Sequence, residues 1–446
     1  MSVARALPAL AALATFVSTA GAHQVTATRF DAPLPLALLY LGAGATVAAT
    51  ALWLARTDPG ETSERRGRAL ATVPSWAATA SRSLAALGFL AVFAGVLAVG
   101  VLGRATPTNP AVVVFWVLWL KGVLVASALA GSPWRALSPW RTVHRALEYV
   151  EGGRIEGRAY PSWLAEWLAT LGFVVLVGVF ENLTVLPRSP ERTSALLAAY
   201  ATLMVCGGLV FGREWYRRAD LFEVFYGLVG RVAPLTVRER EGRLVVVARR
   251  PWTACARPVA STAVVAMVVA SVYTVSFDGF TSTPEYQALF LALRDLGVGH
   301  APGLLVYAVG LLAFLSVFAA VTAIVARITT DSARTVALAV AGSLLPIAVA
   351  YELAHNATHL VENAALLVGA LTGTQPVLLS WLSIPAYWTG QVVLVVAGHL
   401  VAVAAAHHAF DRAYPSGSLR AHAPLVALMV AYTVLSLWIL SRPLAS

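Results

Sequence analysis

The segment 351–363 holds the densest group of side chains that could do chemistry. Carboxylates and imidazoles recur in it at intervals of three, four and three residues: Glu352, His355, His359 and Glu362. On one continuous helix this spacing gives a single stripe, and two imidazoles at i and i+4 beside carboxylates suit zinc or copper. The pattern predicts a metal site, and it fits equally well a solvated amphipathic helix whose side chains hydrogen-bond one another.

Three further side chains could approach the end of this helix: His23, Asp278 and His300. Residues 1–22 have the form of a signal peptide, with Arg5, an apolar stretch and a small-residue end at 20–22. Cleavage after residue 22 would make His23 the N-terminal residue, whose amine and imidazole form a chelate that favours copper. The alternatives are an uncleaved anchor and a terminus without a ligand.

A second polar stripe is predicted in the segment 386–411. Gln391, His399 and His407 recur at intervals of eight residues, which places them on roughly one helix face. His399 lies about 18 Å into the span at 1.5 Å per residue, so near the bilayer midplane. Such a line suits a proton relay or metal passage. It also suits a histidine that packs two helices together.

Lys121 is the one lysine in the chain and falls in the middle of a predicted span. A midplane ammonium needs a carboxylate or carbonyl partner. Glu166 and Glu181 lie nearer the ends of the next span, so the sequence names no partner. We group Lys121 with the stripe on 386–411 as a possible relay. Bis-histidine haem is disfavoured, because His355 and His359 are predicted well above the depth of His399.

Composition identifies the kind of protein that must position these residues. The chain has 446 residues, of which 59% are apolar and 12% charged, and its mean hydropathy is +0.74. A soluble domain carries about 25% charged residues, so a soluble enzyme and a disordered chain are both excluded. We predict an all-α, polytopic transmembrane helix bundle that contacts the lipid bilayer. We attribute the net charge of +10 to basic cytoplasmic loops, so it does not indicate a nucleic-acid partner.

Ten apolar windows are long enough to span a bilayer, and we read residues 23–446 as one membrane domain. The windows are 34–55, 82–103, 111–131, 162–182, 193–212, 259–276, 303–326, 335–354, 386–408 and 423–441. Alternate loops around 56–68, 135–158, 213–257, 327–334 and 412–420 hold most of the arginines, and the other loops hold few. The positive-inside rule therefore places both mature termini outside the cytoplasmic membrane.

The largest cytoplasmic insert is 213–258. It predicts an amphipathic helix beginning at Asp220 and a short β-hairpin from Leu235 that turns at Glu241-Gly242. Its ten arginines are expected to contact anionic lipid headgroups. Only two cysteines occur, Cys206 and Cys255, and no CxxC motif, which disfavours thiolate metal sites and disulfide frameworks.

Several stretches resemble, in order, a family of bacterial and archaeal membrane proteins labelled fenitrothion hydrolase. They are His23, Asp31–Pro35, Phe115-Trp116, Trp134–Arg141, Ala233–Leu235, Ser276–Phe280, Ala350–His355 and Gln391–His407. The chain departs from the family at Gln24, where the family has Gly, at Ser138, where it has Asn, and at His408, where it has an acidic residue. The resemblance implies organophosphate ester hydrolysis by a membrane complex with further membrane or extracytoplasmic subunits.

Three functions follow from these observations. The leading one is a metal-dependent hydrolase or enzyme-complex subunit with an outward-facing copper or zinc site. The second is a transporter or metal-handling permease that uses Lys121, Gln391, His399 and His407 as an intramembrane relay. The third is a structural subunit whose polar groups hold helices together.

Overall fold

In the computed structural model, residues 35–56, 68–155, 157–240, 243–299, 301–414 and 419–442 are described. Ten helices within these ranges are long and apolar enough to cross a membrane, which confirms the predicted polytopic bundle. They span Leu36–Arg56, Ser75–Leu102, Pro110–Ala130, Ser162–Glu181, Pro190–Phe211, Thr262–Thr281, Pro302–Thr329, Ala333–Thr372, Ile384–Ala413 and Arg420–Leu440. The proposed signal peptide and His23 lie outside the described residues.

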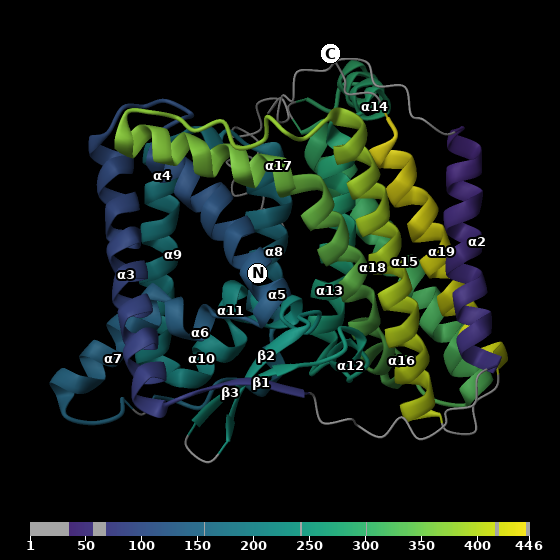
Figure 1. Cartoon of the computed structure of the whole chain (residues 1–446), viewed down its shortest axis with the longest axis horizontal. Helices are drawn as coiled ribbons and strands as arrows, with labels where there is room; N and C mark the ends of the chain where they lie inside the picture. Colours follow the sequence, from purple (N-terminus) through teal and green to yellow (C-terminus); the bar gives the residue numbers. More distant parts are fainter. Residues whose placement is uncertain are drawn as a thin grey trace.

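Seven of these spans are built on single long helices that stand side by side (Figure 1). They are α2 (Leu36–Arg56), α3 (Ser75–Leu102), α9 (Pro190–Phe211), α13 (Thr262–Thr281), α15 (Pro302–Thr329), α18 (Ile384–Ala413) and α19 (Leu419–Leu440). The eighth span in chain order combines α16 (Ala333–Val340), a 3-10 turn (Ala341–Leu344) and α17 (Leu345–Thr372). The last part of α17 crosses the top of the molecule in Figure 1 instead of standing upright.

Two spans contain long π-helical segments. The third span runs through α4 (Pro110–Val112), the π-helix η2 (Val113–Gly122) and α5 (Val123–Ala130). The fourth runs through the 3-10 turn η3 (Ser162–Leu164), α8 (Trp167–Phe173) and the π-helix η4 (Val174–Glu181). π-helical geometry is rare in proteins and often lies at functional sites. In η2 and η4 the side chains point in other directions than they would on a regular α-helix.

A three-stranded antiparallel sheet closes one end of the bundle, and we call this end the sheet end (Figure 1). The strands are β1 (Arg68–Val73), β2 (Leu235–Arg240) and β3 (Arg243–Ala248), in the order β1-β3-β2. Leu235 pairs with Ala248, as the predicted hairpin requires, so the hairpin is confirmed. Strand β1 was not predicted. It comes from the loop between the first two spans and pairs with β3, with an irregularity between Ala69 and Ala71.

Short helices complete the two ends of the bundle. They are α6 (Trp134–Leu137), α7 (Pro139–Glu151), η5 (Leu186–Arg188), α10 (Arg213–Arg218), α11 (Leu221–Val229), α12 (Trp252–Cys255) and α14 (Pro284–Asp295). The side chains of Ser138 and Asp220 cap α7 and α11 by accepting hydrogen bonds from backbone N–H groups. The helix predicted after Asp220 is therefore present as α11, and most of its side chains are buried within the bundle.

Close approach of α17 and α18 fixes the two helices that carry most of the predicted site residues. At Gly398 of α18, an added Cβ would lie 2.8 Å from the carbonyl oxygen of Pro346 and would also clash with Ala350. Only glycine fits there, and small residues at such crossings are how membrane helices pack tightly. The positions of residues on α17 relative to those on α18 are thus tightly set.

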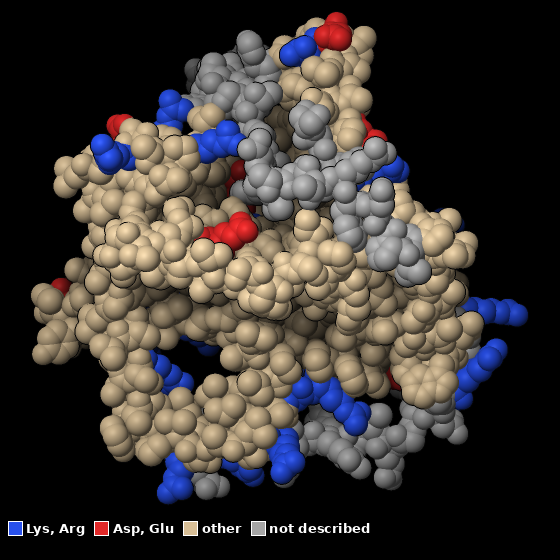
Figure 2. Space-filling view, turned by 45° about the horizontal axis from the view of Figure 1, so that its top comes forward, with Lys and Arg blue, Asp and Glu red and all other residues tan. Residues whose placement is uncertain are grey.

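The surface matches a protein that contacts lipid. Large apolar side chains are exposed along the spans, and exposed tryptophans lie near their ends, among them Trp76, Trp163 and Trp381. In Figure 2 the middle of the face in view carries few charged side chains, and many of the Lys and Arg side chains in view lie toward the bottom. Tryptophans at both boundaries of an apolar band are typical of membrane proteins.

Candidate functional site

Lys121 forms two ion pairs in the interior of the bundle. Its Nζ atom lies 2.9 Å from Oε1 of Glu181 and 3.0 Å from Oε1 of Glu352. The side chains of Lys121, Glu181 and Glu352 are only 9%, 13% and 11% exposed. One ammonium is therefore shared by two carboxylates within an apolar bundle, and we call these three residues the Lys121 cluster.

Three different spans position the Lys121 cluster. Lys121 is the last residue but one of η2, Glu181 is the last residue of η4, and Glu352 lies on α17. Both π-helical segments thus carry a charged residue of the cluster at their C-terminal end. Glu181 was not predicted as a partner because it lies near the end of its span, but the long lysine side chain reaches it there.

A second polar pair lies close to the Lys121 cluster. Nε2 of His355 lies 3.4 Å from Oδ2 of Asp278, near the end of α13. This contact confirms the prediction that Asp278 approaches the helix end that carries His355. The rings of Tyr351 and His355 are stacked with their centroids 6.0 Å apart. At 18% and 24% exposure, Asp278 and His355 are more accessible than the Lys121 cluster.

The charges of this group do not balance. Asp278 interacts electrostatically with Lys121, so three carboxylates surround one permanent cation, and His355 adds a second positive charge only when protonated. A buried charge is stable only when it is paired and hydrogen-bonded. The group can therefore bind one further cation. The smallest cation that can enter is a proton.

The predicted metal residues do not come together as one ligand set in the described part of the chain. All four on α17 belong to one helix, as predicted, yet they have different surroundings. Glu352 pairs with Lys121, His355 pairs with Asp278, Nδ1 of His359 lies 3.2 Å from Nδ2 of Asn363, and Glu362 is exposed. Among the described residues no three His, Cys, Asp or Glu side chains are arranged to hold a metal ion.

The predicted relay residues on α18 each have a separate partner. Gln391 donates from Nε2 to the carbonyl oxygen of Ala354, at 3.0 Å, and to the hydroxyl of Tyr387, at 2.9 Å. Nδ1 of His399 lies 2.8 Å from the carbonyl oxygen of Val395, and the side chain is fully buried. In the described part of the chain, no hydrogen bond joins Lys121, Gln391, His399 and His407 to one another, although Gln391 contacts α17 two residues beyond Glu352.

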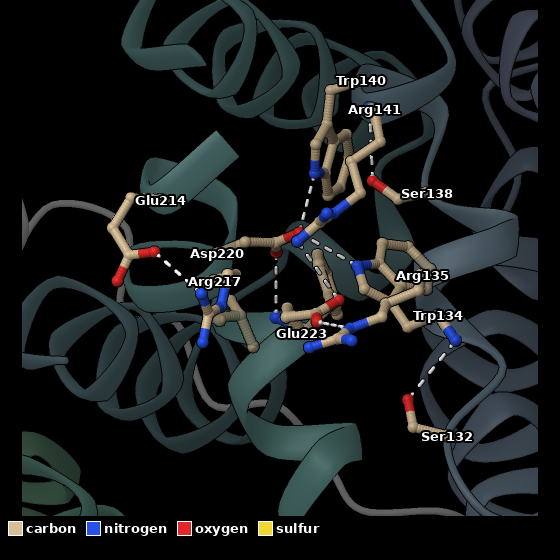
Figure 3. Close-up of polar contacts among 12 residues, drawn as sticks. Ser132, Trp134, Arg135, Ser138, Trp140, Arg141, Glu214, Arg217, Asp220 and Glu223 are labelled. Carbon is tan, nitrogen blue, oxygen red and sulfur yellow. Dashed lines mark hydrogen bonds and ion pairs between the residues drawn. The ribbon is translucent and has the colours of Figure 1, made fainter. Parts of the chain in front are cut away.

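A separate buried carboxylate lies at the sheet end (Figure 3). Oδ2 of Asp220 accepts hydrogen bonds from the indoles of Trp134, at 2.9 Å, and Trp140, at 2.7 Å. Oδ1 accepts one from the Tyr200 hydroxyl, at 3.1 Å, and one from the backbone N–H of Phe222, at 3.0 Å. Burial raises the pKa of Asp220 to about 6, against the opposing effect of the two indole donors.

The stretch Trp134–Arg141 is explained by this arrangement. Its two tryptophans bind Asp220, Ser138 caps α7, and its two arginines flank Glu223 on α11. Nε of Arg135 lies 2.7 Å from Glu223, and Nη2 of Arg141 lies 3.6 Å from it. Figure 3 shows these side chains converging from three short helices. Because every acceptor position of Asp220 is occupied by the chain itself, this group serves the fold.

The chain matches no family model, no curated protein and no solved structure.

Proposed function

We propose that this protein is a multi-pass membrane carrier that takes up and releases protons at the Lys121 cluster. The observation that carries the proposal is one buried lysine shared by Glu181 and Glu352, at 2.9 and 3.0 Å. Ionisable groups inside membrane spans are costly, and they mark ion pathways and proton relays. Among the three functions considered, proton-linked transport uses this group most directly.

The charge balance gives the cluster its proposed chemistry. Lys121 compensates one carboxylate, and the other keeps an excess negative charge in a medium of low dielectric constant. Binding a proton removes this unfavourable charge. When the carboxylate becomes more accessible to water, it releases the proton again. Asp278 and His355, which are more exposed, are the proposed connection to the aqueous phase at the end away from the sheet.

The distribution of arginines supports an orientation for this path. The sheet end carries β2, β3 and most of the arginine-rich loops, so we place it in the cytoplasm. The opposite end, with Asp278 and His355, would then face outward across the cytoplasmic membrane. Protons would enter from the outside through this pair and reach the Lys121 cluster.

Proton flux into liposomes tests this proposal. We expect purified protein in liposomes with a potassium diffusion potential to acidify an internal pH-sensitive dye, and the E181Q/E352Q variant to lose that flux. Glu191→Gln is the matched control, because Glu191 is an exposed carboxylate at the start of α9. Equal acidification by wild type, the double variant and protein-free liposomes would contradict the proposal.

The outward-facing copper or zinc site is our second proposal. The contact between Asp278 and His355 supports it, because a carboxylate behind a histidine orients the imidazole for a metal. His355 would be the ligand that Asp278 orients. The other expected ligands, His359, Glu352, Glu362 and the terminal His23, would have to gather around the ion, because Glu352 is paired with Lys121 and His359 contacts Asn363. Such a site would support ester hydrolysis by lowering the pKa of a bound water, in line with the resemblance to fenitrothion hydrolases.

The number of metal ions bound per chain tests this second proposal without any assay of activity. Protein purified in mild detergent without chelator should contain about one copper or zinc ion per chain, and the His355→Ala/His359→Ala variant should contain none. The exposed Asp295→Asn variant serves as the control. Absence of stoichiometric metal from the wild type would exclude the metal site.

A further inference from the structure

The sheet end of α18 holds a second group of titratable side chains, which the proposed function does not yet use. Nε2 of His407 lies 3.2 Å from Oδ2 of Asp411, one turn further along α18. The ring of His407 also lies 5.9 Å, between centroids, from the ring of His422 on α19. Two imidazoles and one carboxylate thus lie in a row across two adjacent spans.

Exposure increases steadily along this row. His422 is 8% exposed, and its Nε2 atom has no hydrogen-bond partner. The side chain of His407 is 14% exposed and that of Asp411 is 40% exposed. A buried imidazole whose Nε2 has no hydrogen-bond partner therefore lies beside a second imidazole, which contacts a carboxylate that reaches the aqueous phase. This order is what a proton needs to pass from the bundle to water.

Asp411 is the group that can stabilise a positive charge on His407. His408 stacks on Trp252 at 6.5 Å, and Arg250 lies over the same indole. Arg412 donates to the carbonyl oxygen of Ala256 at 3.0 Å. These neighbours, His408, Arg250 and Arg412, are neutral or cationic. An imidazolium at His407 therefore depends on the carboxylate of Asp411. Phe410, edge-on to His422 at 5.0 Å, adds only apolar contact.

Helix α18 links this row to the Lys121 cluster. Gln391, at its other end, binds the carbonyl of Ala354 on α17, two residues beyond Glu352. His399 and His407 follow at successive intervals of eight residues, or about 12 Å each at 1.5 Å per residue. The crossing at Gly398 holds α17 and α18 in close contact between the two ends.

We propose that His422, His407 and Asp411 form the site at which protons leave the bundle on the sheet side. This inference rests on the proposed function. In the release step, Nε2 of neutral His422 accepts one proton from the bundle, and the ring of His422 gives its other N–H proton to the second ring nitrogen of neutral His407. Nε2 of His407 then gives its own proton to the carboxylate of Asp411, which passes it to water, so both imidazoles end the step neutral.

Variants of this row test the inference in the liposome flux assay. We expect His422→Phe and His407→Gln to lower the proton flux about 100-fold, the size of a lost proton-transfer group. Asp411→Asn should lower it too, and because Asp411 is partly exposed this variant should fold normally. Glu151→Gln is the control, because Glu151 is an exposed carboxylate at the end of α7.

Two results overturn the inference, and they differ from each other. Flux in the His407→Gln/His422→Phe double variant equal to that of wild type would show that protons leave elsewhere, with the Lys121 cluster still in use. No flux in the wild type itself would overturn the proposed function and this site with it. Loss of flux in the three variants, with elution as a single peak in detergent, supports the site.

Discussion

Lys121→Met should destabilise the protein by about 3–5 kcal/mol, the cost of leaving buried charges without their partner. Methionine fills a similar volume, so the loss comes from Glu181 and Glu352, which then face one another without a cation. The loss should shrink at low pH, because protonation removes the charge of the unpaired carboxylates. Thermal unfolding in detergent, followed by circular dichroism at several pH values, measures the effect.

A neutral triple variant separates charge from packing in that experiment. Lys121→Met/Glu181→Gln/Glu352→Gln removes all three charges at nearly constant volume, and we expect it to recover most of the lost stability. Arg104→Met, at an exposed position, should change stability by less than about 0.5 kcal/mol. A triple variant less stable than Lys121→Met alone would mean that the three side chains do not act as one charge cluster.

Asp220→Asn should be the most damaging conservative substitution at the sheet end, at about 2–5 kcal/mol. Both carboxylate oxygens face donors: two indole N–H groups on one side and a hydroxyl and a backbone N–H on the other. The amide NH₂ group of asparagine must point toward one of these pairs and leaves donors unsatisfied. Loss of near-ultraviolet circular dichroism from the buried tryptophans gives the measurement.

The pH dependence of Asp220 has the opposite sign to that of an ordinary surface ion pair. Its pKa of about 6 in the folded protein exceeds the ordinary value of 3.8, so the folded state binds the proton more strongly than the unfolded chain does. The contribution of Asp220 to stability should therefore fall as the pH rises between these two values. Asp295→Asn, at an exposed position, should show neither effect, and an equal loss in both variants would contradict this role for Asp220.

The membrane architecture could be predicted from the sequence because it depends on local composition. Apolar windows of about 20 residues locate spans, and the alternation around Glu241-Gly242 predicts a hairpin. Strand β1 was missed, because its pairing with β3 joins loops almost 180 residues apart and leaves no local pattern. The extension of the eighth span to Thr372 was missed too, since the polar residues between Glu352 and Asn363 interrupt the apolar pattern.

The partners of Lys121 could not be predicted for a different reason. Helical periodicity assumes 3.6 residues per turn, and η2 and η4 depart from it at the segments that end with Lys121 and Glu181. Asp278 and His355 were predicted to meet, because both lie at the ends of spans on the same side of the bundle. The hydrogen bonds of Trp134 and Trp140 to Asp220 could not be predicted from the sequence, since Asp220 lies some 80 residues away along the chain.

The most direct measurement of the central claim is the protonation of the Lys121 cluster itself. Infrared difference spectra between about pH 5 and pH 9 should contain two carboxylic acid C=O bands that shift in D₂O, one from the excess carboxylate of the Lys121 cluster and one from Asp220, whose pKa is about 6. We predict that both bands are present in the wild type and in Glu191→Gln, and that E181Q/E352Q loses the band of the cluster and keeps that of Asp220. A spectrum that is identical in wild type and E181Q/E352Q would contradict proton binding at this site.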